Sequence, residues 1–445
     1  MFIPRLIAVA VLGAGFSGGL ARAQMTPKQQ AANLESFDLV WKTVRDRHPD
    51  PNLNGLNWLG MYDQLRPEVE LAPNMLVVRR IMEEMLRKLG TSHYAIIPAS
   101  VYKQIDAAAP PSGANGTTPG DGSTGIVPVI IDHKAVVGSV APDSPAARAG
   151  IKPGMVLEGI DGASVAPMLE LYDVTKDAES QRIVQRSVTR KLDGPPDKGV
   201  MVDVVDASGV SKHVELARVD AEGTLVTFGN LPAIRLKFES RKLAGGAGYI
   251  RFNEFLDPVS IMPKFEAALK EFRAAPGVVL DLRGNPGGIG IMAMGIAGFF
   301  IDESGKKLGE MKMRDATLKF VIFPRPETYP GKLAILIDEG SASTTEILAG
   351  GMQDLGRARI FGTQSAGAAL PSDIIRLPNG DGFQYAQASY TSEKGKVLEG
   401  AGVTPDEVVR QTQEALLAGR DLVIEAAEAW IEQVGQNDKR GEKSN

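Results

Sequence analysis

The stretch LIDEGSASTTEILAGGMQDLG, residues 336–356, contains the change of pattern that decides the fold. An apolar run over residues 333–338 is typical of a buried strand, and a helical pattern starts at Thr344. The run STTE, which begins at Ser343, fits a capping box. A strand-to-helix turn also exposes a hydroxyl beside a helix N-terminus, where developing negative charge is favoured. On this pattern Ser343 is either a helix cap or a nucleophile.

Strand-like and helix-like segments alternate on both sides of this stretch. The strand-like segments are GYIRFNEF, GVVLDLRG, LAILID and RARIFG, and the helical ones cover residues 260–274, 290–300 and 344–355. This alternation predicts an α/β fold with parallel strands covered by helices. An amphipathic helix is expected over residues 412–434. We assign residues 219–434 to this domain and residues 435–445 to a polar, frayed tail.

The N-terminal part of the chain predicts a helical region over residues 24–106. FDLVWKTV and MLVVRRIMEEMLRKL place apolar residues at three- and four-residue spacing. Gly90 ends a helix, and TSHYAII follows as an extended segment. Residues 107–124 are rich in proline, glycine, alanine and serine, so they are expected to form a flexible linker.

Short strands dominate residues 125–218. The run SPAARAGIKPGMVLEGIDG, residues 144–162, combines a short helix, a Pro-Gly turn, a strand and an Asp-Gly turn, and it resembles a PDZ domain of secreted proteases. Such domains hold an extended peptide at a sheet edge and bind its terminal carboxylate with backbone N–H groups. The resemblance assigns peptide binding to Gly125, Ile126 and Val127. The alternative is a small β-domain that only packs.

Composition narrows the classes of function. The chain has 445 residues, of which 43% are hydrophobic, and a net charge of −5, which argues against nucleic acid as a partner. It has no cysteine, which excludes disulfides, thiolate catalysis and cysteine-ligated zinc. No cluster of histidine, aspartate and glutamate has ligand spacing, so neither a metal nor an organic cofactor is expected.

The first 23 residues have the pattern of a secretory signal peptide. Arg5 precedes an apolar stretch, and Ala21-Arg22-Ala23 is a small-x-small cleavage site. A membrane anchor is the alternative, but roughly 20 apolar residues are needed to span a bilayer, and glycine and serine interrupt this stretch. The mature protein is therefore expected outside the cytoplasm, in a bacterial periplasm, without a membrane span.

A nucleophilic serine needs a base, and the chain has four histidines. His48 lies at a helix end, whereas His133 and His213 lie in the region that resembles PDZ. His93 follows the helix stop at Gly90 and is, by elimination, the best general base, because an imidazole pKa of about 6.5 suits that role.

An oxyanion hole is expected in VVLDLRGNPGG, residues 278–288, because the Asn-Pro-Gly-Gly turn can direct a backbone N–H outward. An ordinary loop between strand and helix is the alternative. Gly288, Gly290 and Ala293 also imitate a dinucleotide-binding fingerprint. No acidic residue is well placed downstream, so that interpretation is disfavoured.

Four segments together resemble a known family: GYIRFNEF, VVLDLRGNPGG, GSASTTEILAGGMQDLGRARIFGTQSAG and LEGAGVTPD. In this order they are similar to the core of C-terminal processing (tail-specific) serine peptidases and their tricorn-type relatives. The resemblance implies a multi-domain α/β protein with a crotonase-like or ClpP-like core, an N-terminal helical region and an inserted PDZ domain. It also implies Ser343 as nucleophile, with the backbone N–H groups of Gly288 and Thr344 as oxyanion donors.

The general base divides this family. Tail-specific members carry a lysine in a T-x-G-K-G segment, but Ala368 occupies that position here, and no lysine occurs between Ser343 and Lys394. Tricorn-type members use a histidine preceded by serine, which matches Ser92 and His93, and add a late glutamate, which matches Glu399. The resemblance therefore implies His93 as base, oriented by Glu399 either directly or through Ser92.

Three functions follow as hypotheses. The leading one is a secreted serine endopeptidase that cleaves unfolded or C-terminally exposed proteins, which it binds through the PDZ domain. The loss of the lysine motivates the second, a catalytically inactive peptidase-like protein that binds peptides. The third is binding of a small ligand in the crotonase-like core.

Overall fold

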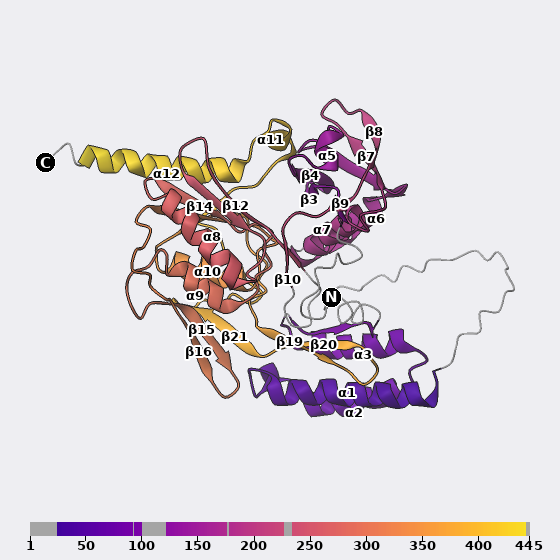
Figure 1. Cartoon of the computed structure of the whole chain (residues 1–445). Helices are drawn as coiled ribbons and strands as arrows, with labels where there is room; N and C mark the ends of the chain where they lie inside the picture. The colour runs from indigo at the N-terminus through magenta and orange to yellow at the C-terminus, as the bar shows by residue number, and fades with distance from the viewer. Residues whose placement is uncertain (1–24, 92, 100–121, 176–177, 227–233, 442–445) are drawn as a thin grey trace, which may run out of the picture.

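A computed structural model describes residues 25–91, 93–99, 122–175, 178–226 and 234–441. The predicted signal peptide and Ser92 lie outside these residues. Figure 1 shows three groups of elements: the N-terminal helices at the bottom, a β-rich region at the upper right and an α/β core at the left. No helix among the described residues is long and apolar enough to cross a membrane.

The core is built on a six-stranded sheet. Its strands, in spatial order, are β12 (Phe238–Lys242), β13 (Gly248–Phe252), β14 (Gly277–Asp281), β17 (Lys332–Ile337), β18 (Arg359–Gly362) and β22 (Glu407–Val408). From β13 onward all neighbours are parallel, and only β12 at the edge is antiparallel. The helices of the core are α8 (Pro258–Glu271), α9 (Gly290–Ala297), α10 (Thr344–Asp354) and α12 (Leu422–Gly441). The α/β fold that the alternation predicts is confirmed.

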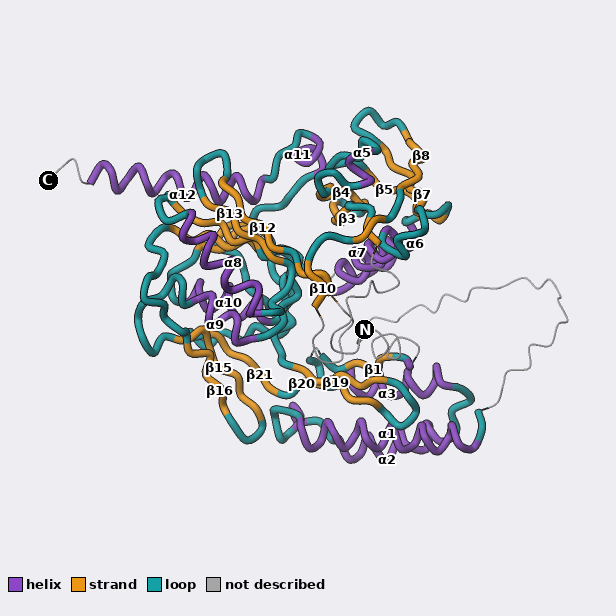
Figure 2. The backbone as a smooth tube through the Cα atoms, viewed as in Figure 1, coloured by secondary structure: helices purple, strands orange, loops and turns teal. Residues whose placement is uncertain are grey.

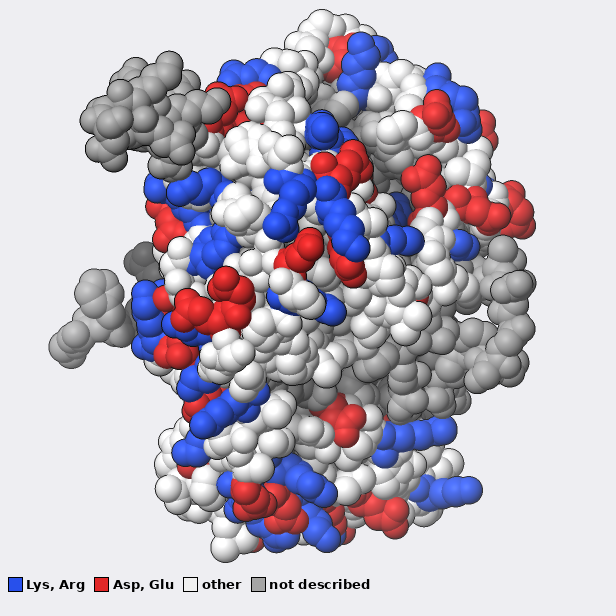
Figure 3. All heavy atoms as spheres, turned by 60° about the vertical axis from the view of Figure 1, so that its left-hand side comes forward, with Lys and Arg blue, Asp and Glu red and all other residues white. Residues whose placement is uncertain are grey.

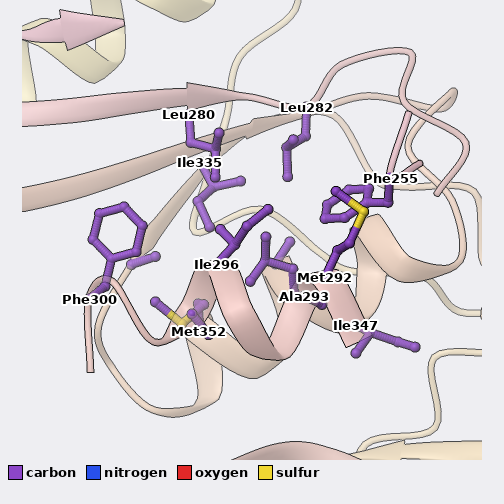
Figure 4. Close-up of a cluster of buried hydrophobic side chains, with 14 of the residues drawn as sticks. Phe255, Leu280, Leu282, Met292, Ala293, Ile296, Phe300, Ile335, Ile347 and Met352 are labelled. Carbon is purple, nitrogen blue, oxygen red and sulfur yellow. The ribbon is translucent and has the colours of Figure 1, made fainter. Parts of the chain in front are cut away.

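Both faces of this sheet are buried, and β17 shows why. Successive side chains of a strand point to opposite faces. Leu333, Ile335 and Ile337 pack in the cluster that contains α8, α9 and α10. Ala334 and Leu336 pack on the other face, in the cluster with α12. Figure 4 shows Leu280 and Ile335 of the sheet above Ile296 and Met352 of the helices. Such continuously apolar strands are typical of parallel sheets covered on both sides.

The N-terminal helices are attached to the core through a small sheet. They are α1 (Pro27–Arg47), α2 (Trp58–Glu70) and α3 (Met75–Arg87), and β1 (Ala95–Ile97) follows them. β1 pairs antiparallel with β20 (Gly382–Ala386), which in turn pairs with β19 (Ser372–Arg376). Arg79 of α3 forms a salt bridge with Asp381 at 2.9 Å. These contacts place residue 93, two positions before β1, beside the core.

The β-rich region contains a sheet of β3 (Ile126–Ile131), β4 (Lys134–Val140), β5 (Val156–Ile160), β7 (Val200–Val205) and β8 (Ser211–Leu216), in that order. β6 (Ala163–Ser164) pairs with β5, and α5 (Pro145–Arg148) is the predicted short helix. Two further helices were not predicted: α6 (Ala166–Thr175) and α7 (Ala178–Leu192). The signal for α7 was present, because Val184, Val188 and Leu192 recur every four residues and are buried.

Two sequence predictions differ from the structure. The linker predicted over residues 107–124 lies mostly outside the described residues, but Gly122–Ser123 form strand β2, which pairs with β9 (Val219–Asp220). The single helix predicted over residues 412–434 is two helices, α11 (Gln413–Leu417) and α12, which continues to residue 441. The break follows from Gly419, with φ of 71°, and from Asp421, which accepts hydrogen bonds from two N–H groups at the start of α12.

The remaining strands complete the surface of the core. β15 (Lys307–Met313) pairs with β16 (Thr317–Val321) and β21 (Ala388–Ser392), and β10 (Thr224–Val226) pairs with β11 (Ile234–Leu236). Figure 2 shows the β15–β16 hairpin projecting from the helical side of the core. Acidic and basic side chains are interspersed over the face in Figure 3, which has no extended basic surface of the kind that binds a phosphate backbone.

Candidate active site

Ser343 lies at the strand-to-helix turn that the sequence predicts, six residues after β17 and directly before α10. Its backbone has φ of 55° and ψ of −118°, a region that non-glycine residues rarely adopt. Its Oγ approaches the N–H of Glu346 as in a capping box but does not reach hydrogen-bond geometry. A strained turn that places a half-buried serine hydroxyl at a helix N-terminus suits a nucleophile.

Glu346 holds the turn in this conformation. One carboxylate oxygen accepts the N–H groups of Ser343 at 3.0 Å and Ala368 at 2.9 Å, and the other accepts the Ser365 hydroxyl at 2.5 Å and the Gly367 N–H at 2.8 Å. Burial raises the pKa of Glu346, and these four donors oppose the rise. The sequence predicts only a helix-capping role for Glu346. Its hydrogen bonds also connect residues 365–368 to the turn that contains Ser343.

Ala368, at the position where the resemblance to tail-specific peptidases implies a lysine, contributes its backbone to the turn. Its carbonyl oxygen accepts the Ser343 N–H at 3.0 Å. An alanine side chain cannot accept a proton, so a general base has to come from elsewhere in the chain.

Two backbone N–H groups lie beside Ser343 without an acceptor among the described residues: those of Gly288 and Thr344. Gly288 has φ of 137°, and the Thr344 hydroxyl donates to its carbonyl oxygen at 2.8 Å, which joins the two segments. A Cβ on Gly287 would lie 2.8 Å from both Ser343 Cβ and Thr344 N. Paired, preorganised N–H groups next to a nucleophile can stabilise an oxyanion.

The partly buried carboxylate of Asp338 joins the loops that carry these groups. Asp338 Oδ1 accepts the Gly284 N–H at 2.7 Å and the Gly340 N–H at 2.9 Å. Burial raises the pKa of Asp338. Because one carboxylate joins the loop after β14 to the loop after β17, the two loops hold a common geometry.

Glu399 contacts the segment 366–369, and His93 is linked to this segment through Arg182. Glu399 accepts the Ala369 N–H at 3.2 Å. Arg182 of α7 donates to the Ala366 carbonyl at 3.3 Å and acts electrostatically on His93. Glu399 thus contacts the segment that is bound to the Ser343 turn, and His93 shares Arg182 as a neighbour with that segment. Ser92 lies outside the described residues.

The His93 side chain is half-buried, and its backbone has φ of 64°. Burial lowers its pKa to about 4, and the positive charge of Arg182 adds to this effect. The imidazole is therefore neutral at pH 7, which is the state that accepts a proton.

The acid limb of any His93-dependent reaction is expected near pH 4. Because the folded pKa is depressed, the neutral base is present above that value and is lost as the pH falls through it. Arg182→Gln is expected to raise this pKa toward 6.5, although not fully, because burial remains the larger cause. The check is the pH profile of kcat/KM. Arg148→Gln, on the distant helix α5, serves as control, and an unchanged limb in Arg182→Gln would contradict the assignment.

The other histidines have different surroundings. Nδ1 of His48 lies 2.9 Å from the carbonyl of Asp50, beyond the end of α1, and Nδ1 of His213 lies 2.5 Å from Asp203 on β7. In the predicted peptide-binding segment, the Gly125 N–H donates to the Ser123 hydroxyl at 3.1 Å and that of Ile126 to the Thr124 hydroxyl at 3.4 Å. The described residues contain no group of three side chains that could hold a metal ion.

Comparison with known proteins assigns two segments of the chain to families. Residues 246–409 match the model of peptidase family S41, and residues 29–87 match the tricorn protease C1 domain. The core of this chain is therefore an S41 peptidase domain. The matched segment contains β13, β14, β17, α10 and β18, together with Ser343 and Glu399.

Relatives of this chain include two bacterial proteins. The chain is 27% identical over 346 residues to a carboxy-terminal-processing protease of Bartonella bacilliformis. The aligned region covers 74% of this chain and 70% of the relative. The chain is 25% identical over 401 residues to a carboxyl-terminal-processing protease of Synechocystis, with 88% and 85% covered. The solved structure of a photosystem II D1 C-terminal processing protease has a TM-score of 0.53 at 22% identity, covering 88% of this chain and 95% of that one, and shows a shared fold.

Proposed function

We propose that this S41 peptidase is a serine endopeptidase that hydrolyses peptide bonds in unfolded or C-terminally exposed proteins. The observation that carries the proposal is the strained Ser343 turn beside the two unused N–H groups of Gly288 and Thr344. Neither a helix cap nor a packing role requires that combination.

The reaction follows the logic of a catalytic triad. Ser343 Oγ attacks the carbonyl carbon of the scissile bond while His93 accepts its proton. The N–H groups of Gly288 and Thr344 donate to the oxyanion of the tetrahedral intermediate. The intermediate expels the amine, which takes the proton from His93, and leaves an acyl group on Ser343. Water, deprotonated by His93, then hydrolyses this ester by the same steps.

Glu399 is proposed to orient and stabilise the His93 imidazolium, either directly or through Ser92. A positive imidazolium in a half-buried site needs a negative partner, since burial and Arg182 both disfavour it. Glu399 is bound to the same segment as the nucleophile turn, which supports this role.

Substrate guidance is proposed for the β-rich region, acting as a PDZ domain. β3 is an edge strand of its sheet, so an extended peptide could pair with it. The Gly125 and Ile126 N–H groups now donate to neighbouring hydroxyls, and a terminal carboxylate would replace those acceptors, with Val127 continuing the strand. The N-terminal signal pattern supports a secreted, periplasmic location.

The test uses residues 24–445 with an unfolded protein substrate, and mass spectrometry identifies the fragments at neutral pH. New internal termini that are absent with heat-inactivated protein are the expected result. A folded wild type that binds the substrate without cutting it would contradict the proposal. The inactive, peptide-binding alternative, which Ala368 at the lysine position motivates, would then account for the result.

Glu399→Gln is expected to lower kcat on the order of 10²–10⁴-fold with little change in KM, because the amide cannot stabilise the imidazolium. Steady-state kinetics provide the measurement. Glu393→Gln removes an exposed glutamate six residues earlier and is expected to be near wild type. If Glu399→Gln keeps more than half of the wild-type kcat, Glu399 has no part in the relay.

A further inference from the structure

A groove of about 570 Å³ lies between α7 and the peptidase core. Arg182, Arg186 and Arg190 line it from α7, Asp193 lies at its end, and Gly284 and Gly340 line it from the core. The three arginines recur every four residues, so they share one face of the helix. This face was not anticipated, because α7 itself was not predicted.

Two of the three guanidinium groups are available to a ligand. Arg182 is occupied by the carbonyl oxygens of Glu339 and Ala366. Arg186 and Arg190 are exposed, and neither has a hydrogen bond or a salt bridge to another residue of the described part of the chain. Asp193 is the acidic residue among those that line the groove, against three arginines, so the lining has an excess of positive charge.

The core side of the groove adjoins the candidate active site. Gly340 lies three residues before Ser343, and Gly284 lies four residues before Gly288. A Cβ on Gly340 would lie 2.8 Å from the Gly284 Cα, so the nucleophile loop and the oxyanion loop touch at this point. Because both residues are glycines, a peptide backbone can come close to this surface.

Glu254 is an independent indication that α7 faces the site. It directly precedes Phe255, whose N–H and carbonyl bond to Gly287 and Ile289 on either side of Gly288. Burial raises the pKa of Glu254 to about 7, and the charge of Arg186 opposes the rise. Arg186 thus acts on the segment that holds the proposed oxyanion donor.

We propose that Arg186 and Arg190 determine specificity by binding a carboxylate of the substrate in the segment that runs from the scissile bond toward α7. This inference rests on the proposed peptidase function. A guanidinium group matches a carboxylate with two parallel hydrogen bonds. The carboxylate is either an acidic side chain or the free C-terminus, and the same contacts serve both.

The experiment compares peptides that differ only by glutamate or glutamine at successive positions after the cleaved bond, each with a free or an amidated C-terminus. Wild type is expected to show kcat/KM about 3- to 10-fold higher for the best-placed glutamate or for the free C-terminus. Salt raised from about 0.05 to about 0.5 M should reduce this preference, because it screens exposed charges. The peptides with an amidated C-terminus show whether the bound carboxylate is the glutamate side chain or the C-terminus.

Arg186→Gln/Arg190→Gln should remove the preference, so that kcat/KM for the glutamate peptide equals kcat/KM for its glutamine counterpart. Arg186→Glu/Arg190→Glu should favour lysine at the same position. Lys191→Gln, an exposed cation of α7 outside the groove, is the matched control and should keep the preference. Equal preference in wild type and in the double glutamine variant would overturn the proposal.

A binding measurement distinguishes failure of this proposal from failure of the proposed peptidase function. Ser343→Ala with labelled peptides gives the ratio of Kd values for glutamate and glutamine peptides without any turnover. A ratio above about 3 that disappears when Arg186→Gln/Arg190→Gln is added supports the groove, even if wild type cuts nothing. The proposal would be refuted if Ser343→Ala bound the glutamate and glutamine peptides with equal Kd values and wild type did not cleave the glutamate peptide faster than the glutamine peptide.

Discussion

Ser343→Ala is expected to lower kcat/KM by about 10⁴–10⁶-fold, because the nucleophile of a serine triad supplies most of the rate enhancement. His93→Ala should cause a loss of similar size, since residues of one catalytic unit are not additive. The kcat/KM of the Ser343→Ala/His93→Ala double variant should therefore be close to that of either single variant.

The Ser343→Ala protein should remain folded. The Ser343 hydroxyl forms no hydrogen bond of good geometry, so its removal leaves no buried polar partner unsatisfied. Cleavage of an unfolded protein and labelling by a serine-directed phosphonate measure the loss, and circular dichroism tests the fold. Ser389→Ala, an exposed serine of β21, is the control. A Ser343→Ala variant that cuts like wild type would remove Ser343 from the mechanism.

Asp281→Ala is expected to lower the free energy of unfolding of the core by about 3–5 kcal/mol, because it leaves a buried cation without its partner. Asp281 is fully buried at the end of β14. Its carboxylate accepts from the Arg283 side chain at 2.6 and 2.9 Å and from the Tyr249 hydroxyl at 2.8 Å. Asp421 also contacts Arg283, at 2.8 Å, and is expected to compensate only in part.

The effect of Asp281→Ala should depend on pH. Burial by itself raises the pKa of Asp281, but Arg283 and Arg251 outweigh it and hold the pKa below its usual range. A depressed carboxyl pKa stabilises the fold above the unfolded value of about 4 and loses this contribution below it. The difference in the free energy of unfolding between wild type and Asp281→Ala should therefore become smaller as the pH falls below about 4.

Denaturant unfolding, with hydrogen exchange followed at β14 and β17, measures this loss. Glu239→Ala breaks the exposed pair with Arg241 and should change the free energy of unfolding by less than about 1 kcal/mol. A loss below about 1 kcal/mol for Asp281→Ala would show that water or Asp421 compensates Arg283 fully.

The local sequence determined much of the fold by itself. Continuous apolar runs such as LAILID can be satisfied only in strands buried on both faces, and the helical spacing between them predicts covering helices. The turn from β17 into α10 was also predictable, and with it the position of Ser343, because small residues and a capping pattern interrupt two strong periodicities.

The tertiary structure alone decided how the site is assembled. His93 and Glu399 lie far from Ser343 in the sequence. The pairing of β1 with β20 attaches the segment that follows His93 to β20, and Glu399 contacts Ala369, next to Ala368, which is bound to Ser343. The fold likewise turned Glu346 from an expected cap into the acceptor of four hydrogen bonds, and brought α7 with its arginines against the core. Local patterns report periodicity and turn chemistry. Contacts between distant segments depend instead on how complementary surfaces pack, and a single sequence carries no separate signal for that.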